Sequence, residues 1–456
     1  MEVEIITIQN IKPSSPTPEH LKIFNLSLLN QLIPSPYAPL IFFYPTTTTI
    51  LDIPKRVDLL KKSLSNTLTH FYPLAGKMRD HFSIDCNDEG ACFIQARVNC
   101  HLKDFLTQPD LVSLNCFLPC GFSRKESLAG THVSNFQVNI FECGGMAIGI
   151  CISHKILDGA ATSTFLKAWS AASRGCSEVV HPNFFAYSTD LFIPAIKLDP
   201  SPVMSTSGKC VTRRFLFDAT ALATLKSQAT DPSSSTKVPT RVEVVSAIIW
   251  KSAMAASKAK QGFQKPSVSA HLVNLRKRIS PPSLAENSIG NLLWIAVAEH
   301  GANSKSDLHD LIRKLREAIS KIDVAFVKKF ADNPPIPESF KGIHELESRR
   351  DKIDYFGFSS WCNCDFYGTD FGWGKPVWVS SIGLEGPLVA NLIILADTSS
   401  GDGIEAWVTL DEEDMAILQR DTELLQFASV DPSPLVMGST VLGKRAHMKA
   451  ARVSAL

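Results

Sequence analysis

Residues 145–159 read Gly-Met-Ala-Ile-Gly-Ile-Cys-Ile-Ser-His-Lys-Ile-Leu-Asp-Gly, and this stretch organises the chain around it. Its first part, 146–152, holds only uncharged and mostly apolar residues, as in a strand buried on both faces. His154 follows where that strand should end, and Asp158-Gly159 precedes a new stripe with helical spacing. A histidine at such a corner is held by rigid elements yet can face a cleft, which suits a general base.

Two other interpretations of His154 have to be weighed. A lone histidine is more often a satisfied, half-buried side chain without a chemical role. The spacing to Asp158 also permits a metal site, because residues four apart share a helix face. We disfavour a metal, since the strand keeps His154 outside a helix interior and no third ligand lies nearby. Neither a Gly-x-Ser-x-Gly elbow nor a glycine-rich phosphate loop occurs, so general-base activation of a substrate group remains.

The composition indicates a globular protein of two domains. The chain has 456 residues, 45% hydrophobic and 20% charged, and a net charge of +1. That charge gives no bulk attraction to nucleic acid or anionic membranes, and no apolar run approaches the length of a membrane helix.

The acidic start Met1-Glu2-Val3-Glu4 is unlike a signal peptide. The eleven cysteines lack zinc-site spacing. We therefore expect a cytoplasmic protein with reduced thiols, and no nucleic-acid or membrane partner.

Working outward from the opening stretch, strand and helix patterns occur in both halves of the chain. Gln137–Phe141 and Met146–Ile152 look like a hairpin that leads to His154. Residues 190–212 are rich in proline and serine and predict a crossover. Thr240–Ala256 reads as a buried helix, and Ser306 is expected to cap a later amphipathic one. The fold class predicted is therefore mixed α/β.

A second unusual stretch, Asp370-Phe371-Gly372-Trp373-Gly374, lies in the second half of the chain. Two aromatic residues alternating with two glycines suggest a tight loop that packs against a neighbouring element. The Asp370 carboxylate is expected to pair with a cation. Composition alone favours a structural role for this loop over a catalytic one.

Together the two stretches resemble the paired signatures of the BAHD acyl-CoA-dependent acyltransferases of plants. Each signature alone is weak, but both in this order, about two hundred residues apart, are specific. Matching segments extend the resemblance from about residue 5 to about residue 430, and they are similar to the vinorine synthase-like branch of alkaloid O-acetyltransferases. These segments are Pro13–Pro18, Phe71–Gly76, Asp85–Asp88, Phe141–Gly145, Val273–Arg276 and Gly290-Asn291.

The resemblance implies a chloramphenicol acetyltransferase-like fold of two similar-sized domains, with a channel at their interface. It implies an N-terminal domain, 1–192, that carries His154, and a crossover loop, 193–212. A C-terminal domain, 213–430, would carry Asp370–Gly374, and the remainder, 431–456, would be a disordered basic tail. Members of the family are usually monomeric and cytosolic, and we expect the same here.

The resemblance also assigns roles to residues. His154 would be the base that takes the proton from an acceptor hydroxyl while its oxygen attacks the acyl-CoA thioester, without a covalent acyl-enzyme. Asp158 would pair with Arg276 and point away from the channel. Asp370 would be needed for activity by fixing its loop, and the Trp361 indole is a candidate oxyanion donor. The motif residues Gly159, Phe371, Gly372, Trp373 and Gly374 would be structural.

The expected co-substrate is acyl-CoA, with acetyl-CoA first, and the acceptor an apolar plant specialised metabolite such as an alkaloid. No permanently bound cofactor and no metal are predicted. Asn30 stands where relatives usually carry aspartate, and Asn363 where an arginine is common. These departures keep open an alternative, a member of the family that binds a metabolite or acyl-CoA without turnover. A metal-dependent hydrolase using His154 and Asp158 is a third hypothesis.

Overall fold

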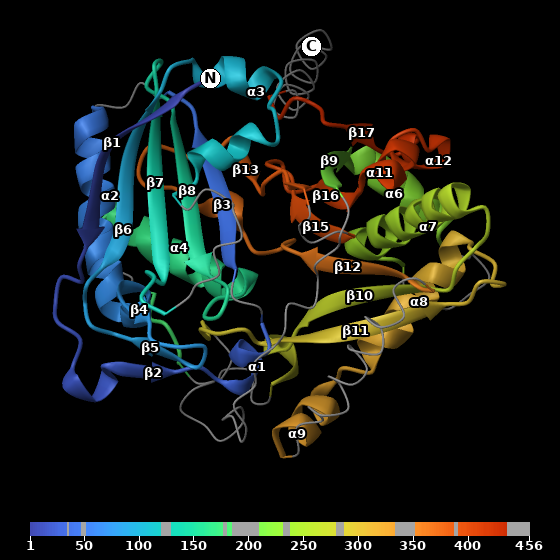
Figure 1. The fold of residues 1–456 in the computed structure, drawn as a ribbon, viewed down its shortest axis with the longest axis horizontal. Coiled ribbons are helices and arrows are strands. Elements are labelled where there is room, and N and C mark those ends of the chain that lie inside the picture. The colour runs from blue at the N-terminus through green and yellow to red at the C-terminus, as the bar shows by residue number, and fades with distance from the viewer. Residues whose placement is uncertain are drawn as a thin grey trace, which may run out of the picture.

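The computed structural model describes residues 1–33, 36–46, 52–119, 129–176, 180–184, 209–230, 238–279, 287–332, 352–386 and 391–435. Within these ranges the strands form two large mixed sheets that lie next to each other, with helices packed on each (Figure 1). The mixed α/β fold class predicted from the sequence is confirmed.

The first sheet contains the opening stretch of the sequence. Its strands, in spatial order, are β1 (Val3–Ile11), β6 (Ala91–Val98), β7 (Ser134–Phe141), β8 (Met146–Ser153), β3 (Tyr37–Tyr44) and β13 (Trp378–Ser380). Strands β7 and β8 pair antiparallel, which confirms the predicted hairpin. Strand β13 comes from the second half of the chain but pairs with β3, so the two halves of the sequence interleave in space.

The second sheet is built from later segments, and a small third sheet flanks the first. The second sheet runs β11 (Leu293–His300), β10 (Ser267–Asn274), β12 (Asp354–Ser360), β15 (Leu392–Asp397), β16 (Ile404–Asp411), β9 (Cys210–Phe217) and β14 (Glu385–Gly386), with β17 (Ser429–Val430) also on β9. The small sheet runs β2 (Ile23–Asn25), β5 (Ser83–Asp85) and β4 (Lys77–Met78). Strand β12 pairs parallel with both of its neighbours.

The helices come from both halves of the chain. Those of the first half are α1 (Leu28–Gln31), α2 (Ile53–His70), α3 (Leu102–Thr107) and α4 (Gly159–Ser173). Of these, α1 packs into the core of the second sheet through Leu28 and Leu29. Those of the second half are α6 (Ala219–Gln228), α7 (Arg241–Gln261), α8 (Leu308–Ser320), α9 (Val324–Asp332), α11 (Glu412–Leu418) and α12 (Thr422–Leu425). The predicted buried helix is α7, which starts in a capping box of Thr240 and Glu243.

The predicted cap of α8 is wrong. Asp307 caps this helix, because its carboxylate accepts from the Asp310 backbone N–H at 2.8 Å. Ser306 lies one residue earlier and its hydroxyl bonds the His300 ring instead. The prediction named only Ser306, but serine and aspartate cap helices about equally well, so residue type alone does not favour Ser306 over the neighbouring Asp307.

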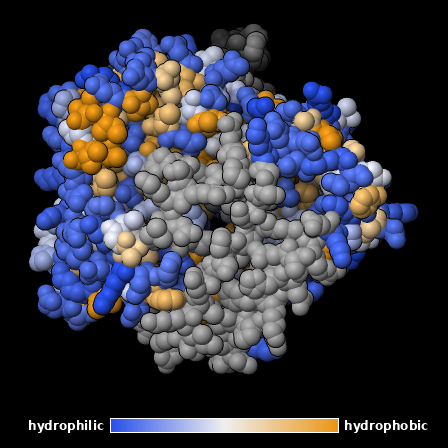
Figure 2. All heavy atoms as spheres, viewed as in Figure 1, coloured by the Kyte–Doolittle hydropathy of each residue, from blue (hydrophilic) through white to orange (hydrophobic). Residues whose placement is uncertain are grey.

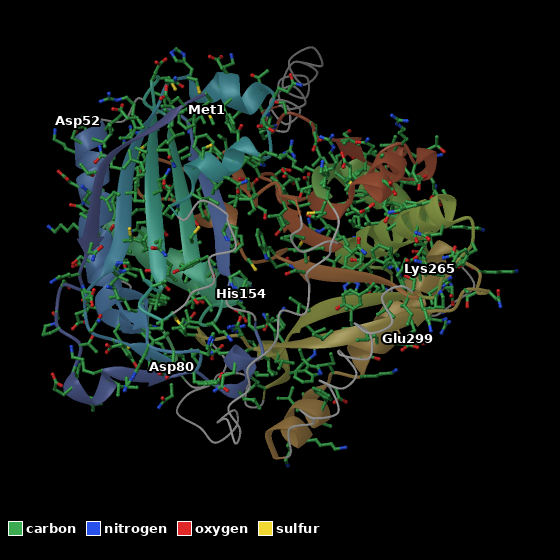
Figure 3. All side chains as sticks on the ribbon, in the orientation of Figure 1. Met1, Asp52, Asp80, His154, Lys265 and Glu299 are labelled. Carbon is green, nitrogen blue, oxygen red and sulfur yellow. The ribbon has the colours of Figure 1, made fainter. Side chains whose placement is uncertain are left out.

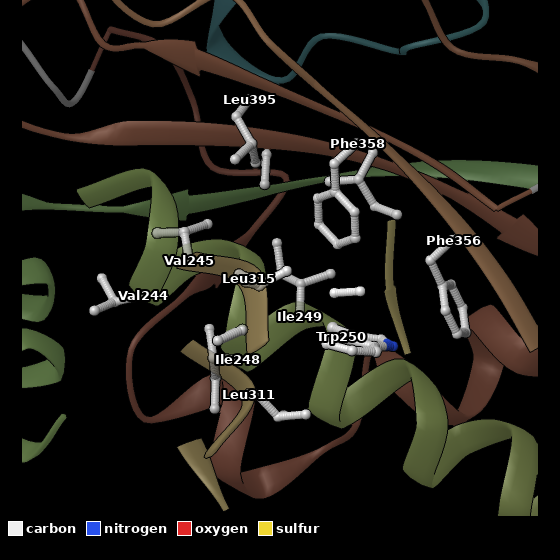
Figure 4. Close-up of a cluster of buried hydrophobic side chains, with 14 of the residues drawn as sticks. Val244, Val245, Ile248, Ile249, Trp250, Leu311, Leu315, Phe356, Phe358 and Leu395 are labelled. Carbon is white, nitrogen blue, oxygen red and sulfur yellow. The ribbon is translucent and has the colours of Figure 1, made fainter. Parts of the chain in front are cut away.

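Each large sheet has its own hydrophobic core. In the second half, α7 and α8 pack on the sheet, and Ile249, Trp250 and Leu315 meet Phe358 of β12 (Figure 4). In the first half, α2 and α4 cover one face of the sheet, and Trp169 of α4 is fully buried there. Burial of this much apolar surface is the main force that holds each layer together.

The two sheets are joined by a buried polar and aromatic cluster. Trp378 of β13 stacks on Trp407 of β16, with ring centroids 6.0 Å apart, and its indole N–H donates to Glu405 at 3.2 Å. Arg214 pairs with Glu405 at 3.3 Å, and both side chains are almost completely buried. Because Trp378 belongs to the first sheet and Glu405 to the second, this cluster fixes the contact between them.

The surface and the ends of the chain add three observations. Ile5, Ile6 and Ile8 of the edge strand β1 are exposed, and hydrophobic side chains gather over that side of the first sheet (Figure 2). No helix among the described residues is long and apolar enough to cross a membrane. Most of the predicted crossover 193–212 and of the tail 431–456 lies outside the described residues, and the predicted domain boundaries stay predictions.

Candidate active site

His154 sits where the sequence predicts it, at the corner between β8 and α4. All eight residues of β8 are buried, and His154 begins the turn that follows, with its side chain half-buried. Its backbone N–H donates to the Pro36 carbonyl at 3.0 Å. The Asp158 carboxylate caps α4 by accepting from the Ala161 N–H at 2.8 Å. His154 therefore stands between two rigid elements and faces the region between the sheets (Figure 3).

The other carboxylate oxygen of Asp158 forms an ion pair with Arg276, as predicted. Arg276 Nη1 lies 2.7 Å from Asp158 Oδ2, which also accepts from the Leu292 N–H at 3.1 Å. The second terminal nitrogen of Arg276 donates to the carbonyls of Ser288 and Gly290. This pair fastens the segment 287–292 against the His154 corner, and it leaves Asp158 with a structural role.

The imidazole of His154 is held by Asn291, a residue that the sequence did not assign to the site. The Nδ1 atom of His154 lies 3.1 Å from Asn291 Oδ1. The Asn291 amide nitrogen donates to the His154 backbone carbonyl at 2.7 Å. Because a carbonyl can only accept, this second bond fixes which end of the amide faces the ring. An amide oxygen facing Nδ1 requires a proton there, so the lone pair lies on Nε2.

Asn30 of α1 continues this chain of amides. Its Oδ1 atom accepts from the Asn291 backbone N–H at 2.7 Å and from the Asn291 side-chain amide at 3.0 Å. Both asparagines are almost completely buried. The Gly290-Asn291 segment is among those that carry the family resemblance. No local pattern could link it to His154, which lies 137 residues earlier.

Asp370 lies far from His154, at the opposite end of α4. Its Oδ1 atom accepts from the Gly372 and Gly374 backbone N–H groups at 2.8 and 2.9 Å. Arg174, which follows α4, donates to the Asp370 carbonyl. The fifteen residues of α4 separate the two motifs by about 20 Å. The carboxylate therefore closes its own loop, and the cation expected to pair with it binds the main chain instead.

The aromatic residues of this loop anchor it on the first sheet. Phe371 is fully buried and meets Trp169 edge to face, with ring centroids 4.7 Å apart. Trp373 stacks on Phe371 and lies under the guanidinium of Arg56. The Tyr44 hydroxyl donates to the Thr369 carbonyl at 3.0 Å. Burial, and then the charge of Asp370, raise the pKa of Tyr44 well above its ordinary value, so this hydroxyl keeps the proton that it donates.

Trp361, the candidate oxyanion donor, follows β12 and lies against the start of α4. A Cβ atom on Gly159 would stand 3.6 Å from the Trp361 ring and 3.5 Å from the Cys364 sulfur. Trp361 also lines a cavity of about 20 Å³ with Tyr367, roughly the space of one water molecule. The structure thus brings Trp361 to the corner that carries His154, while its role stays a prediction.

Asn363, the second departure from the family pattern, lies beside Trp361 on the surface. Its backbone adopts a φ of +67°, a left-handed conformation that asparagine tolerates well, and its N–H donates to Asp397 at 2.7 Å. Within the described residues, no three histidine, cysteine, aspartate or glutamate side chains are grouped so that they could bind a metal ion.

Comparison with known proteins identifies the family of this chain. The sequence matches the Transferase family over residues 1–425. It is 44% identical to limonoid 7-O-acetyltransferase of Citrus sinensis, over 95% of this chain and 100% of that protein. It is 37% identical to vinorine synthase of Rauvolfia serpentina, over 94% of this chain and 99% of that protein.

Solved structures show the same fold. The crystal structure of vinorine synthase matches with a TM-score of 0.82 and 36% identity, over 94% of this chain and 99% of that chain. The F. sporotrichioides TRI101 structure with coenzyme A and T-2 matches in fold, with a TM-score of 0.68 and 19% identity over 90% of this chain and 99% of that chain. This chain therefore belongs to the BAHD acyltransferases, enzymes that transfer acyl groups other than aminoacyl groups.

Proposed function

We propose that this protein transfers an acetyl group from acetyl-CoA to a hydroxyl group of an apolar, polycyclic plant metabolite. The acetyl group is supported by the names of its relatives, which include limonoid and stemmadenine O-acetyltransferases. Identity is 44% to the limonoid enzyme and 36% to the alkaloid enzyme. Limonoid alcohols are therefore the first acceptors to test, followed by alkaloid alcohols.

The observation that carries the proposal is the hydrogen bond between His154 Nδ1 and Asn291. It commits the Nδ1 proton to the amide oxygen and leaves the Nε2 lone pair to accept a proton from substrate. The acceptor hydroxyl gives its proton to Nε2 while its oxygen attacks the thioester carbonyl. The tetrahedral oxyanion then collapses, the carbon–sulfur bond breaks, and the leaving thiolate takes the proton from the imidazolium.

Other residues assist without exchanging protons. Trp361 lies beside the His154 corner and is our candidate to stabilise the oxyanion through its indole N–H. Arg276 and Asp158 hold the segment that carries Asn291, so they position the base indirectly, through Asn291. Asp370 is needed for the shape of its loop, about 20 Å away along α4, and takes no part in proton transfer.

The test is release of free CoA thiol with purified protein, acetyl-CoA and a panel of limonoid and alkaloid alcohols. Product is identified by mass spectrometry, and a reaction without acceptor corrects for hydrolysis. We expect His154→Gln to lower kcat at least ~100-fold, because positioned general bases contribute about that much or more. Equal thiol release by wild type and His154→Gln would refute His154 as the base. Acetyl-CoA or acceptor binding without product across the panel would favour the alternative of a binding protein.

A further inference from the structure

Asn30 is connected to the proposed base through Asn291, by two successive hydrogen bonds. The Asn291 backbone N–H can only donate, so the atom of Asn30 that faces it at 2.7 Å must be the amide oxygen. The same oxygen faces the Asn291 side chain at 3.0 Å, which must therefore present its NH₂ group. That choice turns the Asn291 oxygen toward His154 Nδ1. The Asn291 NH₂ group also donates to the His154 backbone carbonyl at 2.7 Å, so Asn30 and that carbonyl hold the same amide orientation, which determines the tautomer of the imidazole.

The charge of this network depends on position 30. Asn30 is fully buried on α1, where Ser27 caps the helix, and an amide there accepts two hydrogen bonds without a charge. A carboxylate in the same place would accept the same two bonds and add a negative charge near His154. A nearby negative charge stabilises an imidazolium, so it would move protonation of the ring to higher pH.

The other titratable groups around the corner do not supply such a charge. The Lys155 ammonium donates to the Gln31 carbonyl of α1, and Asp158 is neutralised by Arg276 at 2.7 Å. Burial raises the pKa of the Cys362 and Cys364 thiols to about 12, so both stay neutral. The segment 287–292 and helix α1 contribute no ionisable side chain to the corner. Among the described residues, no carboxylate is hydrogen-bonded to His154.

We propose that Asn30 is a positioning residue that sets the working pH of the enzyme. As an uncharged acceptor it fixes Asn291 together with the His154 backbone carbonyl, and through Asn291 the Nδ1–H tautomer of His154, while it keeps negative charge out of the network. The consequence is a base that stays unprotonated at lower pH than it would with a carboxylate at position 30. This inference rests on the proposed role of His154 as the base.

The experiment combines NMR of protein labelled with ¹⁵N-histidine and pH–rate profiles of kcat/KM. The His154 signals are assigned by their loss in His154→Gln. In wild type we expect the tautomer with the proton on Nδ1. In Asn30→Asp we expect the His154 titration midpoint and the acid limb of the profile to rise together by about one pH unit. Asn25→Asp is the matched control, because it adds the same charge at an exposed position of β2.

A second variant tests the positioning role without adding charge. Asn30→Ala removes the acceptor of the Asn291 backbone N–H and one of the two acceptors of its NH₂ group, so only the His154 backbone carbonyl still holds that amide. We expect both His154 tautomers to be populated and kcat to fall roughly ten-fold with little change in KM for acetyl-CoA. A merely structural role would leave the tautomer ratio and the pH profile unchanged while lowering the amount of folded protein.

Three outcomes would overturn the proposal. These are a wild-type His154 with its proton on Nε2, an Asn30→Asp titration that matches wild type, and an Asn25→Asp shift as large as that of Asn30→Asp. The wild-type tautomer measurement needs no substitution at position 30, so it decides even where an Asn30 variant fails to fold. The NMR measurements do not need turnover. Absence of acetyl transfer would therefore refute the proposed function, while the tautomer and the titration of His154 would still test this inference.

Discussion

Arg276 Nη1 lies 2.7 Å from Asp158 Oδ2, and this ion pair joins the first turn of α4 to the segment that carries Asn291. The Asp158 side chain is about 1% exposed and that of Arg276 about 12%. The partners are 118 residues apart in sequence. The pair holds the corner of the first sheet to a segment of the second half of the chain, so its role is structural, and the proposed mechanism relies on that contact.

We predict that Asp158→Asn destabilises the protein by about 3 kcal/mol, because the cap oxygen remains while the buried guanidinium loses its counter-charge. The midpoint of urea unfolding measures the change. Asp52→Asn is the matched control, since Asp52 caps α2 in the same way but pairs with Lys55 on the exposed surface. That variant should lower the urea midpoint much less, because water screens an ion pair on the exposed surface. Equal losses would show that the ion pair adds nothing beyond the cap.

Gly374 lies in the Asp370 loop with a φ of +108°, and an added Cβ would meet no atom within 4 Å. Gly374→Ala therefore tests backbone conformation alone, with an expected cost of about 1–3 kcal/mol. Gly130→Ala is matched, because Gly130 has a φ of +84° and open space around it but lies away from both motifs. We expect similar losses of stability and a lower kcat only for Gly374→Ala. Unchanged kcat in both would mean that the shape of the Asp370 loop is unimportant for catalysis.

Arg214 and Glu405 form a buried ion pair where the two sheets meet, and Arg214 also lies over the Trp378 ring at 5.0 Å. Glu405→Gln leaves the arginine charge buried without a counter-charge, and we expect a loss of about 3–5 kcal/mol. The double variant Arg214→Met with Glu405→Gln removes that charge and should recover most of the loss. A double variant as unstable as the sum of the single ones would refute coupling between these residues.

His271 gives the fold a dependence on pH. It lies on β10, stacked on Phe358 with ring centroids 4.5 Å apart, and burial lowers its pKa from 6.5 to about 4. Between these values the unfolded chain binds a proton that the folded protein does not, so stability falls as pH drops from 6.5 to 4. The full effect is of order 3 kcal/mol.

Unfolding midpoints at pH 7 and pH 4.5 test this effect. His271→Phe keeps an aromatic ring against Phe358 and removes the titration, so it should lose less stability between the two pH values than wild type. His309→Phe, at an exposed position of α8, is the control and should behave as wild type. If His271→Phe shows the same loss as wild type, another group carries the acid sensitivity.

Local patterns predicted the parts of the site that are contiguous in sequence. The strand before His154, the turn at Asp158 and the helix after it follow from residues within about twenty positions, and the structure has all three. The pairing of Asp158 with Arg276 came from the family resemblance, since no local rule links residues so far apart. The cap of α8 was misplaced by one residue, because Ser306 and Asp307 are both good caps.

The sequence by itself determined the fold class, the family and the place of His154 at the corner between a strand and a helix, because short-range periodicity and two motifs encode them. Only the tertiary structure decided what holds the His154 ring. Asn30, Asn291 and His154 come from three distant segments, and the hydrogen bonds that select one tautomer exist only where folding brings those segments together. The structure likewise separated Asp370 from His154 by the length of α4, since distance in space depends on packing and not on order in the chain.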